Sequence, residues 1–260
     1  MNIYLELTEE FNRGGLRAVI CSGQAVVLHR LAIMSKDGDW ILREDQESLS
    51  RVLSVLAARG ATYRFGAPLD LRWLRHGWSS HLEFQHGNLR VRTDFFTRPP
   101  RLNANDLAKM WKTQQGRNPP FVGLKELAEL KKTNREKDYA VIGELARNLP
   151  TLLERMLYSR SARDLLKMKE EGPGTWAQAV KIREALQSAG GGRDPLEVAL
   201  DHERRQLMRV NEERLDRYES SAAKWAKCWP DVTRKLGGLP LQEAHAAMVS
   251  AAEDALPYEP

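Results

Sequence analysis

The order of apolar and polar residues over the first hundred positions predicts alternating helices and strands. Helical spacing is found over 5–11, 23–31 and 46–59 and in a short turn near 69–75, whereas strand patterns occupy 17–21, 37–42, 61–65, 81–85 and 89–96. Gly87-Asn88 separates the last two strand patterns. A two-residue turn of this kind predicts an antiparallel hairpin. The pattern therefore indicates an α+β (mixed α/β) core.

Residues after Asn103 carry helical periodicity, and the sequence predicts an all-helical C-terminal half. Breaks in it are expected at the Gly- and Pro-rich joints 118–120, 171–174 and 189–192. We expect a core over 1–102, a helical extension over 103–171 and a helical C-terminal region over 172–260.

A long helix is predicted to begin at Asp194-Pro195 and to end at Pro230, because proline interrupts helices. Its later part carries an apolar stripe at spacings of three and four, made of Leu215, Tyr218, Ala222, Trp225 and Trp229. Such a stripe is typical of a core or of a face that meets a partner helix.

Composition limits the class of protein. The 260 residues are 42% hydrophobic and 29% charged, enough for one large domain or two smaller ones. The sequence contains no apolar run of about 18 residues, the length that would cross a membrane. The first ten residues lack the pattern of a secretory signal. Cys21 and Cys228 are far apart and lack CxxC spacing, which argues against disulfides and favours a cytoplasmic protein.

The overall charge permits an anionic partner but does not require one. Formal net charge is +5 and the isoelectric point is about 9.2. A basic protein of this kind can bind a polyanion, and an ordinary solvated basic surface is an equally good interpretation.

Three aspartates form the strongest candidate for chemistry. Alternation along the predicted strand 37–42 places Asp37 and Asp39 on one face, and a neighbouring strand could bring Asp94 beside them. Carboxylates so near to one another repel, and a divalent cation such as Mg²⁺ or Mn²⁺ would therefore stabilise the group. Asp37-Gly38-Asp39 is also typical of an ordinary turn, which remains the alternative.

Two glycines, Gly23 and Gly38, affect the backbone geometry of the predicted site. Ser22-Gly23 lies between a predicted strand and helix, where backbone N–H groups suit the terminal phosphates of a nucleotide. Serine fits this turn if the position needs no positive φ. Gly38 is expected to loosen the strand, and a bulge there would turn Asp37 and Asp39 apart.

A second candidate is the basic run from Leu130 to Tyr139. If it is helical, Lys132 and Arg135 are three positions apart and face the same phosphate. Lys137 adds another cation, and Asp138 would orient one of these cations or shape the nucleotide pocket. The alternative is a solvated helix face whose ion pairs contribute little.

Together these residues resemble a known family. Strand, Ser22-Gly23, helix, Asp37-x-Asp39 and a later acid are similar to the nucleotidyltransferase fold of the DNA polymerase beta superfamily. The run from Leu130 to Tyr139 resembles a helix of minimal bacterial nucleotidyltransferase-like proteins, including toxins of the AbiEii type. In that helix a lysine is followed by the motif Arg-x-Lys-Asp. The two matches span about 17–145, roughly half of the chain.

The resemblance implies a nucleotidyltransferase-like core sheet with flanking helices and a magnesium-dependent reaction. A nucleoside monophosphate would pass from a nucleoside triphosphate to a hydroxyl group, and pyrophosphate would leave. The implied catalytic and metal-binding residues are Asp37, Asp39 and Asp94. The implied nucleotide-binding residues are Ser22, Gly23, Lys132, Arg135, Lys137 and Asp138.

Several partners stay open at this stage. The acceptor implied by the resemblance is an RNA end, a small molecule or a protein side chain, and a toxin–antitoxin or phage-defence role follows from the resemblance alone. A catalytically silent fold that binds nucleic acid or a protein partner is the alternative function. A homodimer through the C-terminal helices is a further hypothesis.

Aromatic and histidine residues receive structural interpretations. Basic and aromatic residues interleave at Trp73, Arg75, Trp78, Arg90 and Arg92. They could hold a nucleic-acid strand, but packing against the sheet is the favoured interpretation. His29 is predicted to be a core histidine, and His76, His81 and His86 lack a convincing ligand spacing and are predicted to be surface or structural residues.

Overall fold

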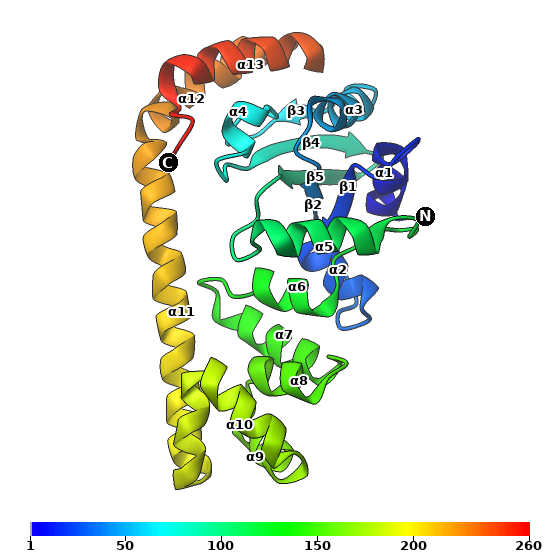
Figure 1. The fold of residues 1–260 in the computed structure, drawn as a ribbon. Coiled ribbons are helices and arrows are strands. Elements are labelled where there is room, and N and C mark those ends of the chain that lie inside the picture. The colour runs from blue at the N-terminus through cyan, green and yellow to red at the C-terminus, as the bar shows by residue number, and fades with distance from the viewer. Residues whose placement is uncertain (1) are drawn as a thin grey trace. The chain divides into compact units, whose positions relative to one another are not determined.

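A mixed sheet forms the centre of the first part of the chain (Figure 1). Within residues 2–260, which the computed structural model describes, five strands form it in the order β1-β2-β5-β4-β3. They are β1 Ala18–Cys21, β2 Asp37–Leu42, β3 Thr62–Tyr63, β4 Ser80–His86 and β5 Leu89–Phe96. The β2–β5 pair is parallel, and the other pairs are antiparallel. The predicted hairpin is confirmed, because β4 and β5 pair around Gly87-Asn88.

The chain divides into two compact units. We call the residues up to Val122 together with Asp216–Pro260 the sheet unit, and Gly123–Leu215 the helical unit. The boundaries predicted at 102 and 171 followed composition and motifs, and they stay a prediction.

The helices of each unit are as follows. In the sheet unit they are α1 Ile3–Phe11, α2 Ser22–Leu28, α3 Gln46–Ala57, α4 Leu71–Leu74, α5 Ala104–Gln114, α12 Ala223–Leu236 and α13 Leu241–Ala255. In the helical unit they are α6 Leu124–Leu130, α7 Glu136–Arg147, α8 Leu152–Tyr158, α9 Ala162–Glu171, α10 Pro173–Ile182 and the 3₁₀ helix η1 Glu184–Gly191. The long helix α11 Arg193–Ser221 contributes residues to both units. The α+β class with a helical C-terminal half is therefore confirmed.

Aromatic rings form the core on one face of the sheet. Trp40 of β2 stacks on Phe95 of β5 with 5.4 Å between ring centroids, and Phe11 of α1 meets both rings edge-on. All three side chains are fully buried. The indole Nε1 of Trp40 donates to Thr8 Oγ1 at 2.9 Å, so the buried polar group of the ring is satisfied. These contacts hold α1 against β2 and β5.

Gly38 sits in a regular strand, so the bulge that would have turned Asp37 and Asp39 apart does not occur. The register of β2 against β5 runs unbroken from Asp37 to Ile41. A Cβ atom at Gly38 would lie 2.5 Å from the ring of Tyr4 and 2.4 Å from that of Trp40. Glycine is required here because two buried aromatic rings occupy the space of a side chain.

The two tryptophans of the apolar stripe pack within the sheet unit. Trp225 is buried and donates from Nε1 to the carbonyl of Gly66 at 2.9 Å, and Trp229 meets Phe65 edge-on. The predicted end at Pro230 is wrong, since α12 continues to Leu236 and the helical run breaks at Ala222 instead. Buried Trp225 and Val232 anchor α12 on both sides of the proline, which removes a single backbone donor.

The packing interpretation of Trp73 and Trp78 is confirmed. Trp73 and Trp78 are buried, and their indole N–H groups donate to the carbonyls of Leu256 and Tyr258. His29 is half-buried rather than part of the core, and it bonds the carbonyl of Val122 through Nε2 and meets the ring of Phe121 edge-on. Within the described part of the chain, no helix has the length and apolar character needed to span a membrane.

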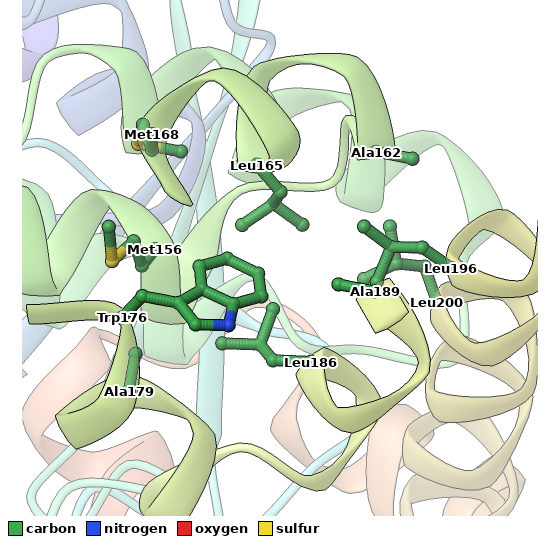
Figure 2. Packing of buried hydrophobic residues seen from close by; sticks show 10 residues of the cluster. All are labelled: Met156, Ala162, Leu165, Met168, Trp176, Ala179, Leu186, Ala189, Leu196 and Leu200. Atoms are coloured by element: carbon green, nitrogen blue, oxygen red, sulfur yellow. The ribbon is translucent and has the colours of Figure 1, made fainter. Parts of the chain in front are cut away.

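The helical unit has its own hydrophobic core (Figure 2). Trp176 of α10 lies among Leu165, Met156 and Leu186, and Leu196 and Leu200 of α11 complete the cluster. The first half of α11 is thereby anchored within this unit.

We predict that Gly38→Ala destabilises the protein by about 2 kcal/mol, because the new methyl group overpacks Tyr4 and Trp40. Urea unfolding measures the change. Gly174→Ala in α10 is the matched control, since nothing lies within 4 Å of its Cβ position. Equal unfolding free energies for the two variants would contradict the packing argument.

Candidate active site

The three predicted acids lie on adjacent strands. Asp39 of β2 is the register partner of Asp94 of β5, and Asp37 is the partner of Arg92. Asp37 and Asp39 are half-buried and alternate with fully covered Gly38 and Trp40, so they share the face opposite the aromatic core. The turn interpretation of this segment is wrong, because Asp37–Leu42 is a strand.

The Ser22-Gly23 turn adjoins the same acids. Cys21 is the register partner of Asp39, and the chain enters α2 directly after it. Ser22 has φ of +54°, so the condition under which serine would fit this turn without strain is not met. A left-handed backbone costs about 1–2 kcal/mol for a residue other than glycine. The turn therefore has the backbone geometry that a glycine at this position would adopt without strain.

Asp94 is held by two neighbours on the sheet face. Its Oδ1 accepts from Arg64 Nη1 at 3.1 Å and lies 2.7 Å from His81 Nδ1. His81 was predicted to be a surface or structural residue, and its contact with a candidate catalytic acid was missed. Counting back from the Gly87-Asn88 turn pairs His81 with Asp94, so the hairpin register carried the signal.

Asp37 has the environment of a cation ligand. Its Oδ1 is shielded from solvent and has no hydrogen-bond partner within the described residues. Arg92 Nη1 lies 3.8 Å from this oxygen, within ion-pair range but beyond hydrogen-bonding distance. A buried carboxylate oxygen without a hydrogen bond is a destabilising feature that a bound cation would relieve.

The three acids lie close enough to Tyr4 to influence its pKa. Its hydroxyl donates to the carbonyl of Lys36 at 2.6 Å. Burial raises the pKa of Tyr4, and the charges of Asp37, Asp39 and Asp94 raise it further. All three carboxylates therefore act on one phenol at the start of β2.

The protein side chains by themselves do not form a three-ligand metal cage. Among residues 2–260, no group of three or more His, Cys, Asp and Glu side chains is placed to share one ion. Magnesium is commonly held by one or two carboxylates together with substrate phosphates. Asp37 and Asp39 have the carboxylates for that mode, and the ligand roles of Asp37, Asp39 and Asp94 all stay predictions.

The basic run does not form the predicted helix. α6 ends at Leu130, residues 131–134 form a turn, and Arg135 is the N-cap of α7. Lys132 and Arg135 therefore do not share a helical face, and that expectation is wrong. Thr133 and Asn134 favour turns because their side chains compete for backbone hydrogen bonds. The Oγ1 of Thr133 accepts from the backbone N–H of Arg135 at 3.0 Å.

Asp138 is the centre of a buried cluster in this turn. Its carboxylate accepts from Lys131 Nζ at 3.2 Å, from Thr133 Oγ1 at 2.7 Å and from Arg135 Nε at 2.9 Å. Burial by itself would raise the pKa of Asp138, but these hydrogen bonds and the charges of Lys131 and Arg135 lower the pKa overall. The hydrogen bonds of Asp138 therefore stabilise the turn between α6 and α7.

The other two cations of the run have separate surroundings. Lys132 Nζ lies 2.6 Å from Glu129 Oε1 and 4.9 Å from the ring centroid of Tyr158. Lys137 is exposed and lines a cavity of the helical unit that Lys132 does not line. The four predicted nucleotide-binding residues of this run belong to the helical unit and the three acids to the sheet unit. A site that joins them stays a prediction.

We predict that Asp138→Asn destabilises the protein by about 3–5 kcal/mol, since it leaves the buried Lys131 charge without its partner. The folded pKa of Asp138 lies below the unfolded value, so its contribution is present above the unfolded pKa of about 3.9 and is lost as pH falls through the folded pKa. Urea unfolding at pH 7 and at lower pH measures both effects.

Glu144→Gln is the matched control, because Glu144 and Arg147 form an ion pair of two largely exposed side chains. We expect it to change stability by less than about 1 kcal/mol. A loss equal to that of Asp138→Asn would contradict the special role of the buried pair.

Comparison with known proteins gives one remote likeness. No protein-family model matches the chain, and no curated protein does. A crystal structure of a candidate nucleotidyltransferase from H. pylori aligns at 13% identity, covering 80% of this chain and 94% of that one. The TM-score is 0.39. At these values the likeness carries no argument about activity, and the residues of the site must carry it.

Proposed function

We propose that the protein is a magnesium-dependent nucleotidyltransferase that moves a nucleoside monophosphate from a nucleoside triphosphate to a hydroxyl acceptor. One observation carries the proposal. The Ser22-Gly23 turn, the Asp37 and Asp39 pair and Asp94 meet on three adjacent strands, β1, β2 and β5. This is the set of groups that the reaction needs in one place.

Each residue of the proposed site has a defined part. Asp37 and Asp39 would hold the metal, which when bound supplies positive charge to the triphosphate as pyrophosphate leaves. The backbone N–H groups after Ser22 would donate hydrogen bonds to the terminal phosphate oxygens. Asp94 would accept the proton of the attacking hydroxyl, and its contacts with Arg64 and His81 orient its carboxylate.

One observation favours a second function. Arg64 pairs with Asp94, and Arg92 lies near Asp37, so cations of the protein already balance two of the acids. A catalytically silent module that binds anionic partners through this sheet face would have the same contacts. Metal dependence distinguishes the two functions. The acceptor, the toxin or phage-defence role and a homodimer stay predictions.

We predict that nucleoside triphosphates bind in Mg²⁺, and that a chelator or the double variant Asp37→Asn/Asp39→Asn weakens binding at least about tenfold, or 1.4 kcal/mol. Calorimetric titration with each of the four common triphosphates measures it. The matched control is Asp231→Asn/Asp254→Asn, which removes the same charge from exposed helix positions.

Three results of this titration have distinct meanings. Metal-dependent binding that only the Asp37/Asp39 variant loses supports the enzyme. Binding that survives the chelator and that variant supports the silent module and contradicts catalysis at these acids. The absence of binding by every triphosphate contradicts the proposed nucleotide site.

A further inference from the structure

The helical unit contains a cavity that the proposed reaction does not use. Its volume is about 580 Å³. Its wall combines charged and aromatic side chains, including Tyr139, Tyr158, Arg160, Ile182, Arg183 and Glu203. Cavities of roughly 300–1,000 Å³ with a few convergent polar groups are typical of small-molecule sites.

Two arginines of the wall share one carboxylate. Arg183 donates from Nε and Nη2 to the two oxygens of Glu203 at 2.9 and 2.7 Å, and from Nη1 to the carbonyls of Met156 and Ser159. Arg160 donates from Nη1 to Glu203 and from Nη2 to the carbonyl of Leu200 at 2.7 Å. The exposed fractions of the two arginine side chains are only 6% and 15%.

This arrangement leaves one positive charge in excess. Burial would raise the pKa of Glu203, but Arg183 and Arg160 lower the pKa overall, so the carboxylate stays ionised. Burial lowers the pKa of Arg160, although a guanidinium remains protonated in proteins. Two buried cations therefore face one anion, and a second anion within reach would be favoured.

The other lining charges do not cancel this excess within the buried wall. Lys132 is paired with Glu129, and together they are neutral. Glu184 lines the cavity as an exposed side chain, where water screens its charge. His202 and the phenols of Tyr139 and Tyr158 are the remaining titratable groups of the lining.

Flat and apolar surfaces adjoin the cationic wall. The guanidinium of Arg160 lies over the ring of Tyr139, with 5.5 Å to the ring centroid. Ile182 lines the cavity with 65% of its surface exposed, and Leu157 is another apolar side chain of the lining. An apolar group of a ligand in the cavity would contact these apolar side chains of the lining.

We propose that this cavity binds a small organic anion that carries a carboxylate or phosphate on a planar apolar ring. The anionic group would meet the excess charge of the Arg160 and Arg183 pair. The ring would cover the apolar surface at Ile182.

The test uses 8-anilinonaphthalene-1-sulfonate, an organic anion whose sulfonate is carried on a planar naphthalene ring, titrated calorimetrically into the full chain without Mg²⁺. We expect one saturable site per chain. Ser188→Trp fills the cavity and should weaken binding at least tenfold. Val198→Trp places the same side chain on α11 at a position that is 69% exposed and outside the lining, and should leave binding unchanged. Near-ultraviolet circular dichroism checks that both variants are folded.

Competition separates the two anionic groups. Displacement of the probe by benzoate indicates a carboxylate ligand, and displacement by inorganic phosphate indicates a phosphate ligand. A chain that does not bind the probe, a probe that neither anion displaces, or equal affinity in the two tryptophan variants would each overturn the proposal. Because Mg²⁺ is absent, the result does not depend on Asp37 and Asp39.

Discussion

The parallel pairing of β2 with β5 is the constraint on which the candidate site depends. It sets Asp39 beside Asp94 and Asp37 beside Arg92. Because side chains alternate along a strand, a slip of one residue would turn the acids into the core and the aromatic rings into solvent. The stack of Trp40 on Phe95, with Phe11 against both, fixes the register from the opposite face.

Arginines balance the charges of two of the acids on this face of the sheet. Arg64 contacts Asp94, and Arg92 lies within ion-pair range of Asp37, so the acids do not repel one another without compensation. Under the proposed function, the same cations would also face a triphosphate. Asp37 Oδ1 remains the atom whose environment a further cation would most improve.

The helical unit contains two buried clusters of charged side chains. Lys131 pairs with Asp138 beneath the α6–α7 turn, and Arg183 with Arg160 surrounds Glu203. Each cluster obeys the rule that a buried charge needs a partner. The members of the basic run have different surroundings because the chain leaves the helix at Lys131.

The sequence by itself determined the features that depend on neighbours along the chain. Period-two alternation placed Asp37 and Asp39 on one face, and the Gly87-Asn88 turn set the hairpin register, which also brings His81 opposite Asp94. Only the tertiary structure decided the β2–β5 pairing and the need for glycine at position 38, because Phe95 and Tyr4 are remote in sequence from β2. The continuation of α12 past Pro230 was likewise decided by packing, since the contact of Trp225 with Gly66, distant in sequence, overrides local propensity.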